Sequence, residues 1–178
     1  MKKLIFSFFA FLLITGCTPP MEEIDVAKEE EAIKAVIEGE INASFDGDYE
    51  TWTNFFAHKP YTFWLQASQG GYLCWKGWEE ISSKAKDLFK PDREGSIIYE
   101  GSYEYTIRVY KDAALVTFKS KITGKVEDES INYDGIEVRS LEMQDGEWKI
   151  TYLGTVRPAT YEDAEDDGEE GDDNDEDD

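Results

Sequence analysis

The second half of this chain reads as four long strands joined by short turns, and this pattern restricts the possible folds more than any other feature. Apolar and polar side chains alternate along much of it, which is typical of half-buried strands. Asp145-Gly146 and Lys111-Asp112 have the composition of tight turns, and a polar loop is expected over residues 125–130. The expected strands cover residues 97–110, 113–123, 131–144 and 147–156. Strands joined in this way predict an antiparallel sheet.

The first half predicts three helices and two short strands. Apolar residues recur every three or four positions from Ile33 to Phe45, which gives one apolar stripe along a helix. Asp48 is a candidate N-cap for a second helix, and Pro60 ends that helix. The helices are expected over 24–45, 49–57 and 77–89, and the short strands over 61–67 and 72–76. Helices grouped before hairpin-linked strands predict an α+β domain in which a long, twisted sheet curls around the first helix.

The N-terminus predicts export and lipidation. Lys2 and Lys3 precede an apolar run over 4–14, which is shorter than the roughly 20 residues that span a bilayer. Ile14-Thr15-Gly16-Cys17 resembles the bacterial lipobox, which implies that Cys17 receives a diacylglycerol and that the chain is cut before it. An ordinary signal peptide with an incidental cysteine is the alternative. Palmitate-type acyl chains then hold the protein to a cell-envelope membrane, and Thr18 favours the outer membrane of a Gram-negative cell.

Charge and composition divide the chain into four segments. We expect a signal peptide over 1–16, a lipidated tether over 17–23, one domain over 24–160 and a disordered acidic tail over 161–178. The formal net charge is −22, and 13 of the 40 Asp and Glu lie in residues 162–178, where there is no Lys or Arg. The tail lacks the ligand spacing of an EF-hand. Without a basic patch, nucleic-acid binding is not expected.

Four stretches resemble the NTF2-like superfamily, of the SnoaL-like or DUF4440-like type, which is related in fold to ketosteroid isomerase. They are Glu31–Ile37, Phe45–Trp52, Gly77-Trp78-Glu79-Glu80-Ile81 and Asp145–Ile150, and the resemblance covers residues 29–157. It implies a cone of about three helices on a curved, mostly antiparallel sheet, with a mouth between sheet and helices. Such proteins include isomerases, cyclases, dehydratases, ligand binders and association modules, so the fold leaves the function open. They commonly pair through the open sheet face, which implies a possible homodimer.

Aromatic and polar side chains supply the candidate pocket. The candidate residues are Trp52, Phe56, His58, Tyr61, Trp64, Tyr72, Trp78, Tyr103, Tyr105, Glu137 and Tyr152. Aromatic walls with few polar groups suit a flat or apolar ligand, although a plain core is the alternative for the same rings. Trp64 and Phe63 are neighbours on one strand, so only one of them can line the cone. Asp134 and Glu137 are separated by an odd number, so they cannot both point inward on a regular strand.

The chemistry of an isomerase needs a carboxylate base and a hydrogen-bond donor in an apolar pocket. Candidate carboxylates are Glu104, Asp134, Glu137 and Glu142, but none stands in a motif matching the isomerase's base, so the catalytic residues stay unknown. His58 can act as a general base or lie at the pocket rim. Once Cys17 is acylated, Cys74 has no disulfide partner; a Cys74–His58 nucleophilic pair is possible, and a buried apolar cysteine is favoured. No metal or cofactor is expected.

These patterns predict a membrane-anchored protein that binds a small apolar or aromatic ligand in its cone, or that serves as a non-catalytic association module. The rival function is an isomerase or cyclase that uses a pocket carboxylate and a tyrosine. The interior of the cone discriminates between them: a carboxylate buried opposite a tyrosine hydroxyl favours the enzyme, a continuous apolar lining favours binding, and a filled cone favours a structural role.

Overall fold

The computed structural model describes residues 24–68, 70–89, 96–126 and 129–157. In chain order the elements are α1 Val26–Phe45, α2 Tyr49–Thr53, β1 Phe63–Ser68, β2 Gly71–Lys76, α3 Trp78–Ala85, the 3-10 helix Lys86–Phe89, β3 Ser96–Val109, β4 Ala113–Val126, β5 Glu129–Gln144 and β6 Glu147–Val156. Cys17, the signal segment and the acidic tail lie outside the described residues. Within the described ranges, no helix combines the length and the apolar character needed to cross a membrane.

Local sequence signals account for the first two helices. The Asp25 carboxylate caps α1 by accepting a hydrogen bond from the Lys28 backbone N–H at 3.2 Å. The predicted cap at Asp48 is confirmed, since its carboxylate accepts from the Thr51 N–H at 3.0 Å. The apolar stripe of α1 buries Ile33 and Ile37 completely against the sheet. The helix is therefore held by both its cap and its packing.

Three boundaries differ from the sequence-based expectation. α2 ends at Thr53 rather than at residue 57, because Phe56 forms a bridge to Ile150 of β6 instead of continuing the helix. The third helix is α-helical only to Ala85 and then tightens into a 3-10 turn. The prediction of a loop over residues 125–130 is wrong, because β4 and β5 stay paired as far as Val126 and Glu129.

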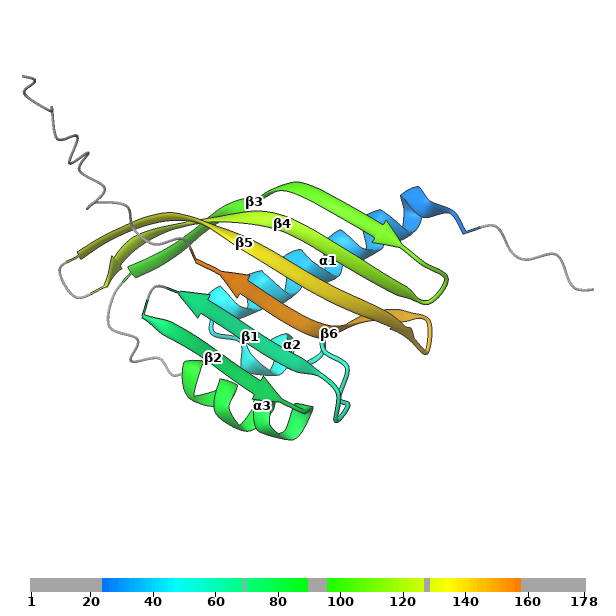
Figure 1. The fold of residues 1–178 in the computed structure, drawn as a ribbon, viewed down its shortest axis with the longest axis horizontal. Helices are drawn as coiled ribbons and strands as arrows, with labels where there is room; N and C mark the ends of the chain where they lie inside the picture. The colour runs from blue at the N-terminus through cyan, green and yellow to red at the C-terminus, as the bar shows by residue number, and fades with distance from the viewer. Residues whose placement is uncertain (1–23, 69, 90–95, 127–128, 158–178) are drawn as a thin grey trace, which may run out of the picture.

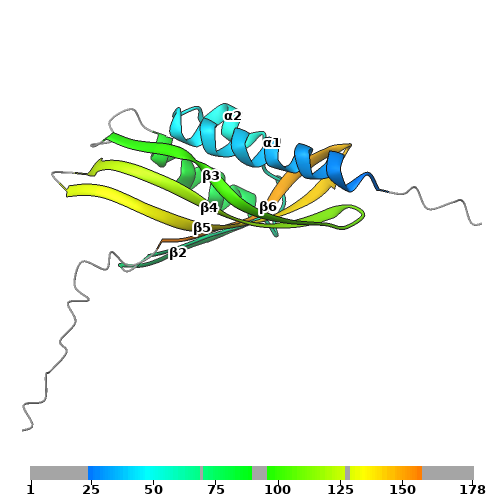
Figure 2. The ribbon, with the colours of Figure 1, turned by 90° about the horizontal axis from the view of Figure 1, so that it is seen from above.

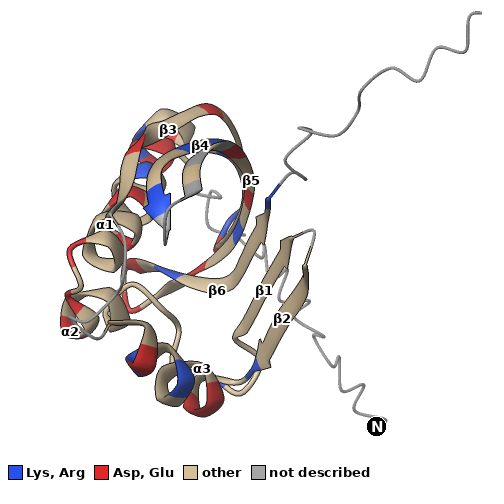
Figure 3. Ribbon diagram, turned by 90° about the vertical axis from the view of Figure 1, so that its left-hand side faces the viewer, with Lys and Arg blue, Asp and Glu red and all other residues tan. Residues whose placement is uncertain are grey.

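The six strands form a single sheet in the order β2-β1-β6-β5-β4-β3. β1 and β6 are parallel, and the other four pairings are antiparallel. All three helices lie on one side of this sheet (Figures 1 and 2). Seen end-on, the long strands curl around α1 (Figure 3). The predicted α+β fold with a curved, mostly antiparallel sheet is confirmed.

A dense aromatic cluster fills the core between α2, α3 and the sheet. Trp52 is its centre, almost fully buried, with ring centroids 4.4 Å from Phe56, 5.7 Å from Trp64 and 5.3 Å from Phe89. Trp78 stacks against Phe56 at 5.6 Å. Buried aromatic pairs of this kind contribute about 0.5–1.5 kcal/mol each beyond their area burial. Aromatic side chains therefore fill this end of the cone.

Candidate functional site

A cavity of about 530 Å³ lies between the C-terminal end of α1 and the concave face of the sheet. Its apolar lining comes from Ile41, Phe45, Trp64, Leu73, Leu88, Phe89, Ile97, Ile122 and Leu153. Its polar lining comes from Glu40, Ser44, Gln66, Tyr99, Ser120, Glu137, Arg139, Thr155 and Arg157. The volume falls in the range of about 300–1,000 Å³ that small-molecule sites occupy.

Three charged side chains form a buried ion network in the cavity wall. Arg139 of β5 lies between two carboxylates: its Nη2 is 3.1 Å from Glu40 Oε2, and its Nη1 is 3.0 Å from Glu137 Oε2. Its Nε also donates to Glu40 Oε2 at 3.3 Å. All three side chains are more than nine-tenths buried. Glu40 lies on α1 and the other two on β5, so the network ties the helix to the sheet.

Neutral groups complete the hydrogen bonding of this network. Glu137 accepts from the Ser120 hydroxyl at 3.0 Å and from the Thr155 hydroxyl at 2.7 Å. Glu40 accepts from Trp52 Nε1 at 3.0 Å. The Arg139 Nη1 also donates to the backbone oxygens of Val138 and Gly154, both at 3.2 Å, and the guanidinium lies over the Phe118 ring. The site is thus a rigid, well-satisfied polar wall.

Burial and the neighbouring charges shift the pKa values of Glu40 and Arg139 in opposite directions. Burial raises the pKa of the Glu40 carboxyl, although Arg139 and the bond from Trp52 partly oppose that rise. Burial alone would lower the pKa of the Arg139 guanidinium, but Glu40 and Glu137 outweigh it and raise that pKa overall. Arg139 therefore stays charged, and the two carboxylates with one guanidinium leave one negative charge when both carboxyls are ionised.

A second polar cluster lies at the edge of the cavity. The Tyr99 hydroxyl, on the wall, donates to Glu38 Oε2 at 3.0 Å, and the Tyr105 hydroxyl donates to Glu38 Oε1. Burial is the largest cause that raises the pKa of each tyrosine, and Glu38 adds to it. Both hydroxyls therefore stay protonated and are engaged with one carboxylate.

Of the eleven candidate pocket residues, the structure places Trp64 and Glu137 in the cavity wall. Trp64 faces inward while its neighbour Phe63 stacks on Tyr152, with centroids 5.7 Å apart, so the two neighbours take opposite faces as expected. Glu137 is buried and Asp134 is exposed, which fits their odd separation. Trp64 Nε1 is buried without a hydrogen-bond partner among the described residues, and the ring packs edge-on against Trp75.

The other nine candidates lie outside that wall. Trp52, Phe56 and Trp78 belong to the aromatic core, and Tyr105 packs beside the cavity on Phe118. His58 is exposed and stacks on Trp78 at 4.2 Å, beside a shallow depression of about 240 Å³.

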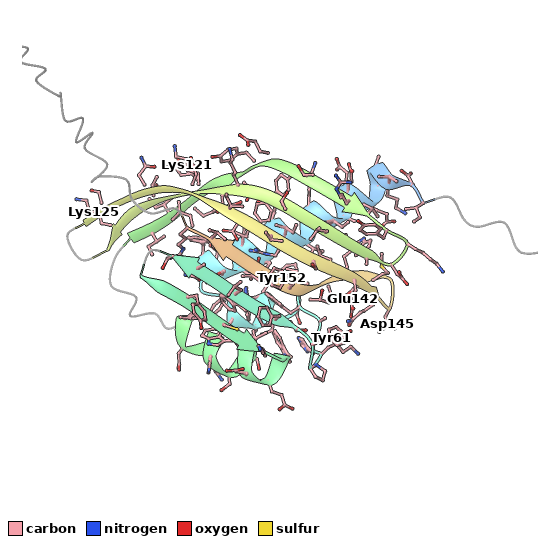
Figure 4. The ribbon with its side chains drawn as sticks, viewed as in Figure 1. Tyr61, Lys121, Lys125, Glu142, Asp145 and Tyr152 are labelled. Carbon is pink, nitrogen blue, oxygen red and sulfur yellow. The ribbon has the colours of Figure 1, made fainter. Side chains whose placement is uncertain are left out.

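The remaining candidates lie on outer surfaces. Tyr61 is 58% exposed and donates to Glu142 at 2.6 Å near the β5–β6 turn (Figure 4). Tyr72 is 80% exposed, and Tyr103 is exposed on β3. Tyr152 lies near the middle of the outer sheet face (Figure 4). Cys74 is half-buried on β2, so it is less buried than expected.

Sequence reasoning missed Glu40 and Arg139. For each of these two residues, its position in the sequence pattern could have indicated that it is buried. Glu40 directly precedes Ile41 and follows Ile37 by three positions, so it lies on the apolar stripe of α1. Arg139 is two residues from Glu137, so both side chains share one face of β5. A charge on an apolar stripe and two charges on one strand face together indicate a buried ion network.

No group of His, Cys, Asp and Glu suited to a metal ion occurs among the described residues.

The comparisons with known proteins bear on the fold alone. No family model matches the chain, and no curated protein matches it in sequence. Solved structures do match. An NTF2-like protein of unknown function from Pseudomonas putida KT2440 superposes with a TM-score of 0.62 at 21% identity, over 79% of this chain and 93% of that one. The fold is NTF2-like.

Two further solved structures that match the chain carry functional descriptions. A proposed dehydratase from Streptomyces avermitilis matches with a TM-score of 0.60 at 14% identity, over 74% of this chain and 97% of that one. A ketosteroid isomerase-like protein from Erwinia carotovora atroseptica matches with a TM-score of 0.56 at 16% identity, over 73% of this chain and 96% of that one. At such identities these likenesses establish a shared architecture and not a shared activity.

Proposed function

We propose that this protein is a membrane-anchored, NTF2-like lipoprotein that binds a small apolar or aromatic ligand in its cavity. The observation that carries the proposal is a cavity of about 530 Å³ whose wall combines apolar and aromatic side chains with buried polar groups. This combination is typical of small-molecule sites, where apolar surface supplies affinity and polar groups set orientation. The lining is not continuously apolar, and its polar groups include those of the Glu40–Arg139–Glu137 network.

The rival isomerase or cyclase needs a carboxylate that is free to accept a proton. Glu137 is instead held by Arg139, Ser120 and Thr155. These three donors therefore already bond to the oxygens of this carboxylate. The Tyr99 hydroxyl on the wall is directed to Glu38 rather than to Glu137. This arrangement supports ligand binding over proton abstraction.

A neutral fluorescent probe tests the cavity directly. N-phenyl-1-naphthylamine is expected to bind the chain from residue 17 onward, carrying Cys17→Ser, with enhanced emission. Ile122 is buried in the cavity wall on β4, so Ile122→Trp should fill the space and weaken binding at least about tenfold, which is about 1.4 kcal/mol. Leu115→Trp, on the opposite face of the same strand, is the matched control. Unchanged binding in Ile122→Trp would contradict the proposal.

The lipid anchor is a separate part of the proposal and rests on residues 14–17. The expected result is that the full-length protein incorporates labelled palmitate in a bacterial host and sediments with membranes, while Cys17→Ser loses both properties. The readouts are autoradiography of the protein band and fractionation of the envelope. Ser7→Ala, within the apolar run of the signal segment, is the control. Labelling that persists in Cys17→Ser would rule out this residue as the attachment point.

The outer sheet face supports a second candidate function, as an association module that forms a homodimer. Ile136 and Val156 are paired across β5 and β6, and are 54% and 47% exposed. Their neighbours Val138, Phe63 and Tyr152 share this face by register. β1 and β2 carry few charged residues (Figure 3). An exposed apolar patch on a sheet is typical of an interaction surface.

A charge placed in this patch tests the homodimer. The chain carrying Cys17→Ser is expected to elute as a dimer, and Val156→Lys is expected to convert it to a monomer because each subunit would bury an unpaired lysine in an apolar interface. Val26→Lys is the matched control, since Val26 is 50% exposed at the start of α1. Light scattering after size-exclusion chromatography gives the mass. A wild-type monomer at micromolar concentration would exclude this function.

A further inference from the structure

We infer that the cavity selects a ligand whose polar end donates a hydrogen bond, such as a hydroxyl group, over one whose polar end can only accept, such as a ketone. This inference rests on the proposed ligand-binding function and names the chemical class of the ligand. Two features of the described residues carry it. One is the hydrogen bonding of the Glu40–Arg139–Glu137 network, and the other is the space that a glycine leaves beside the Glu137 carboxylate.

The donor groups of the network already have acceptors in the protein. Arg139 donates from Nε and Nη2 to Glu40, and from Nη1 to Glu137 and to two backbone oxygens. The Ser120 and Thr155 hydroxyls both donate to Glu137. A hydroxyl group has one hydrogen to donate, so it cannot also donate to a ligand while this bond is kept. A ligand group that only accepts therefore competes with a carboxylate for these hydrogens.

The two carboxylates keep acceptor capacity for a ligand. A carboxylate oxygen can accept about two hydrogen bonds. The Oε2 atoms of Glu40 and Glu137 each accept two, with Arg139 as a donor to both. Each Oε1 atom accepts one bond within the described part of the chain, from Trp52 in the case of Glu40 and from Ser120 in the case of Glu137. Both side chains line the cavity, so each Oε1 has a position for a ligand donor.

Gly135 leaves room beside the Oε1 atom of Glu137. It is paired with Ser120 across β4 and β5, and it lies two residues before Glu137, on the same face of β5. A Cβ atom at Gly135 would lie 3.3 Å from Glu137 Oε1 and 3.0 Å from Ser120 Oγ. Any other residue would therefore place a carbon against the oxygen that has the remaining acceptor position. The lack of a side chain keeps that oxygen approachable.

The other polar groups of the wall do not offer a donor at this position. Trp64 Nε1 is buried, so it presents no surface to the cavity. The Gln66 amide both donates and accepts, so it favours neither kind of ligand. Arg157 carries donors only, but it follows β6, whereas Glu137 Oε1 faces Ser120 of β4, on the other side of β5. A ligand group beside Glu137 Oε1 therefore meets acceptors.

Three probes with one carbon skeleton test the inference. The chain from residue 17 onward, carrying Cys17→Ser, is titrated by calorimetry into 1-(1-naphthyl)ethanol, which donates, 1-acetonaphthone, which only accepts, and 1-ethylnaphthalene, which does neither. We expect the alcohol to bind at least about tenfold tighter than the ketone. The reason is that the alcohol gains a bond to a charged acceptor, whereas a buried ketone oxygen loses its bonds to water without gaining a donor.

Two variants locate the source of the preference. Glu137→Gln keeps an oxygen that can accept from Arg139 but adds an amide N–H, so the preference for the alcohol over the ketone should fall at least about fivefold. Glu142→Gln, on the opposite face of β5, is the matched control. Gly135→Ala leaves every charge in place but puts a methyl group beside Oε1, so it should also reduce the preference. Gly70→Ala is its control, since a Cβ atom there has no neighbour within 4 Å.

The outcomes separate this inference from the proposed function. If none of the three probes binds and N-phenyl-1-naphthylamine does not bind either, the ligand-binding function fails and this inference falls with it. If the ketone binds as tightly as the alcohol or more tightly, the cavity binds ligands but the donor preference is overturned. A preference that is unchanged in both Glu137→Gln and Gly135→Ala would also overturn it, because Glu137 Oε1 would not be its source.

Discussion

Arg139→Met is expected to lower the free energy of unfolding by about 3–5 kcal/mol, because it leaves two buried carboxylates without their shared counter-charge. Glu40 and Glu137 are each more than nine-tenths buried, and each is bonded to this guanidinium. The raised pKa of Glu40 already reflects how unfavourable its charged form is in this environment, even with Arg139 in place.

Thermal and urea unfolding followed by circular dichroism measure this effect, with an expected loss of roughly 10–20 °C in midpoint. Arg108→Met, an exposed arginine on β3, is the matched control and should change little. Adding Glu40→Gln and Glu137→Gln to Arg139→Met should recover much of the loss, since neutral amides do not carry the charge penalty. A loss below about 1 kcal/mol in the single variant would mean that the network does not hold α1 to the sheet.

Trp52→Ala is expected to cost about 3–5 kcal/mol or more, since it empties the centre of the aromatic core. The indole packs on Phe56, Trp64 and Phe89 and donates its Nε1 hydrogen to Glu40. Removing it both opens a large void and takes away one of the hydrogen bonds to a buried carboxylate. The void lies next to the cavity, so the wall formed by Trp64 loses its support as well.

The same unfolding measurements separate packing from hydrogen bonding. Trp52→Phe keeps a ring in place but removes the bond to Glu40, so we expect a smaller loss of about 1.5–3 kcal/mol. Tyr72→Ala removes an aromatic ring that is 80% exposed and should be nearly neutral. Equal losses in Trp52→Ala and Tyr72→Ala would show that the cluster around Trp52 does not stabilise the fold.

Much of the fold could be predicted because it depends on local signals. The alternation from Ser96 onward, the Asp145-Gly146 turn and the cap at Asp48 each act within a few residues, and the strands and helices appear where those signals place them. At the end of α2, where the prediction failed, a tertiary contact was responsible. α2 stops at Thr53 because Phe56 pairs with a strand almost a hundred residues later. The β4–β5 hairpin extends past Thr123 because pairing continues through polar residues.

The candidate site was harder to predict than the fold because it depends on contacts between residues that are far apart in the sequence. The sequence by itself determined the order of the elements, the apolar stripe of α1, the opposite faces of Phe63 and Trp64, and the acidic charge carried after residue 161. Only the tertiary structure decided that Glu40 meets Arg139, 99 residues away, and that Trp64 and Arg157 share a cavity wall with them. Local patterns report which face a side chain takes, whereas the curvature and register of the sheet decide which faces meet.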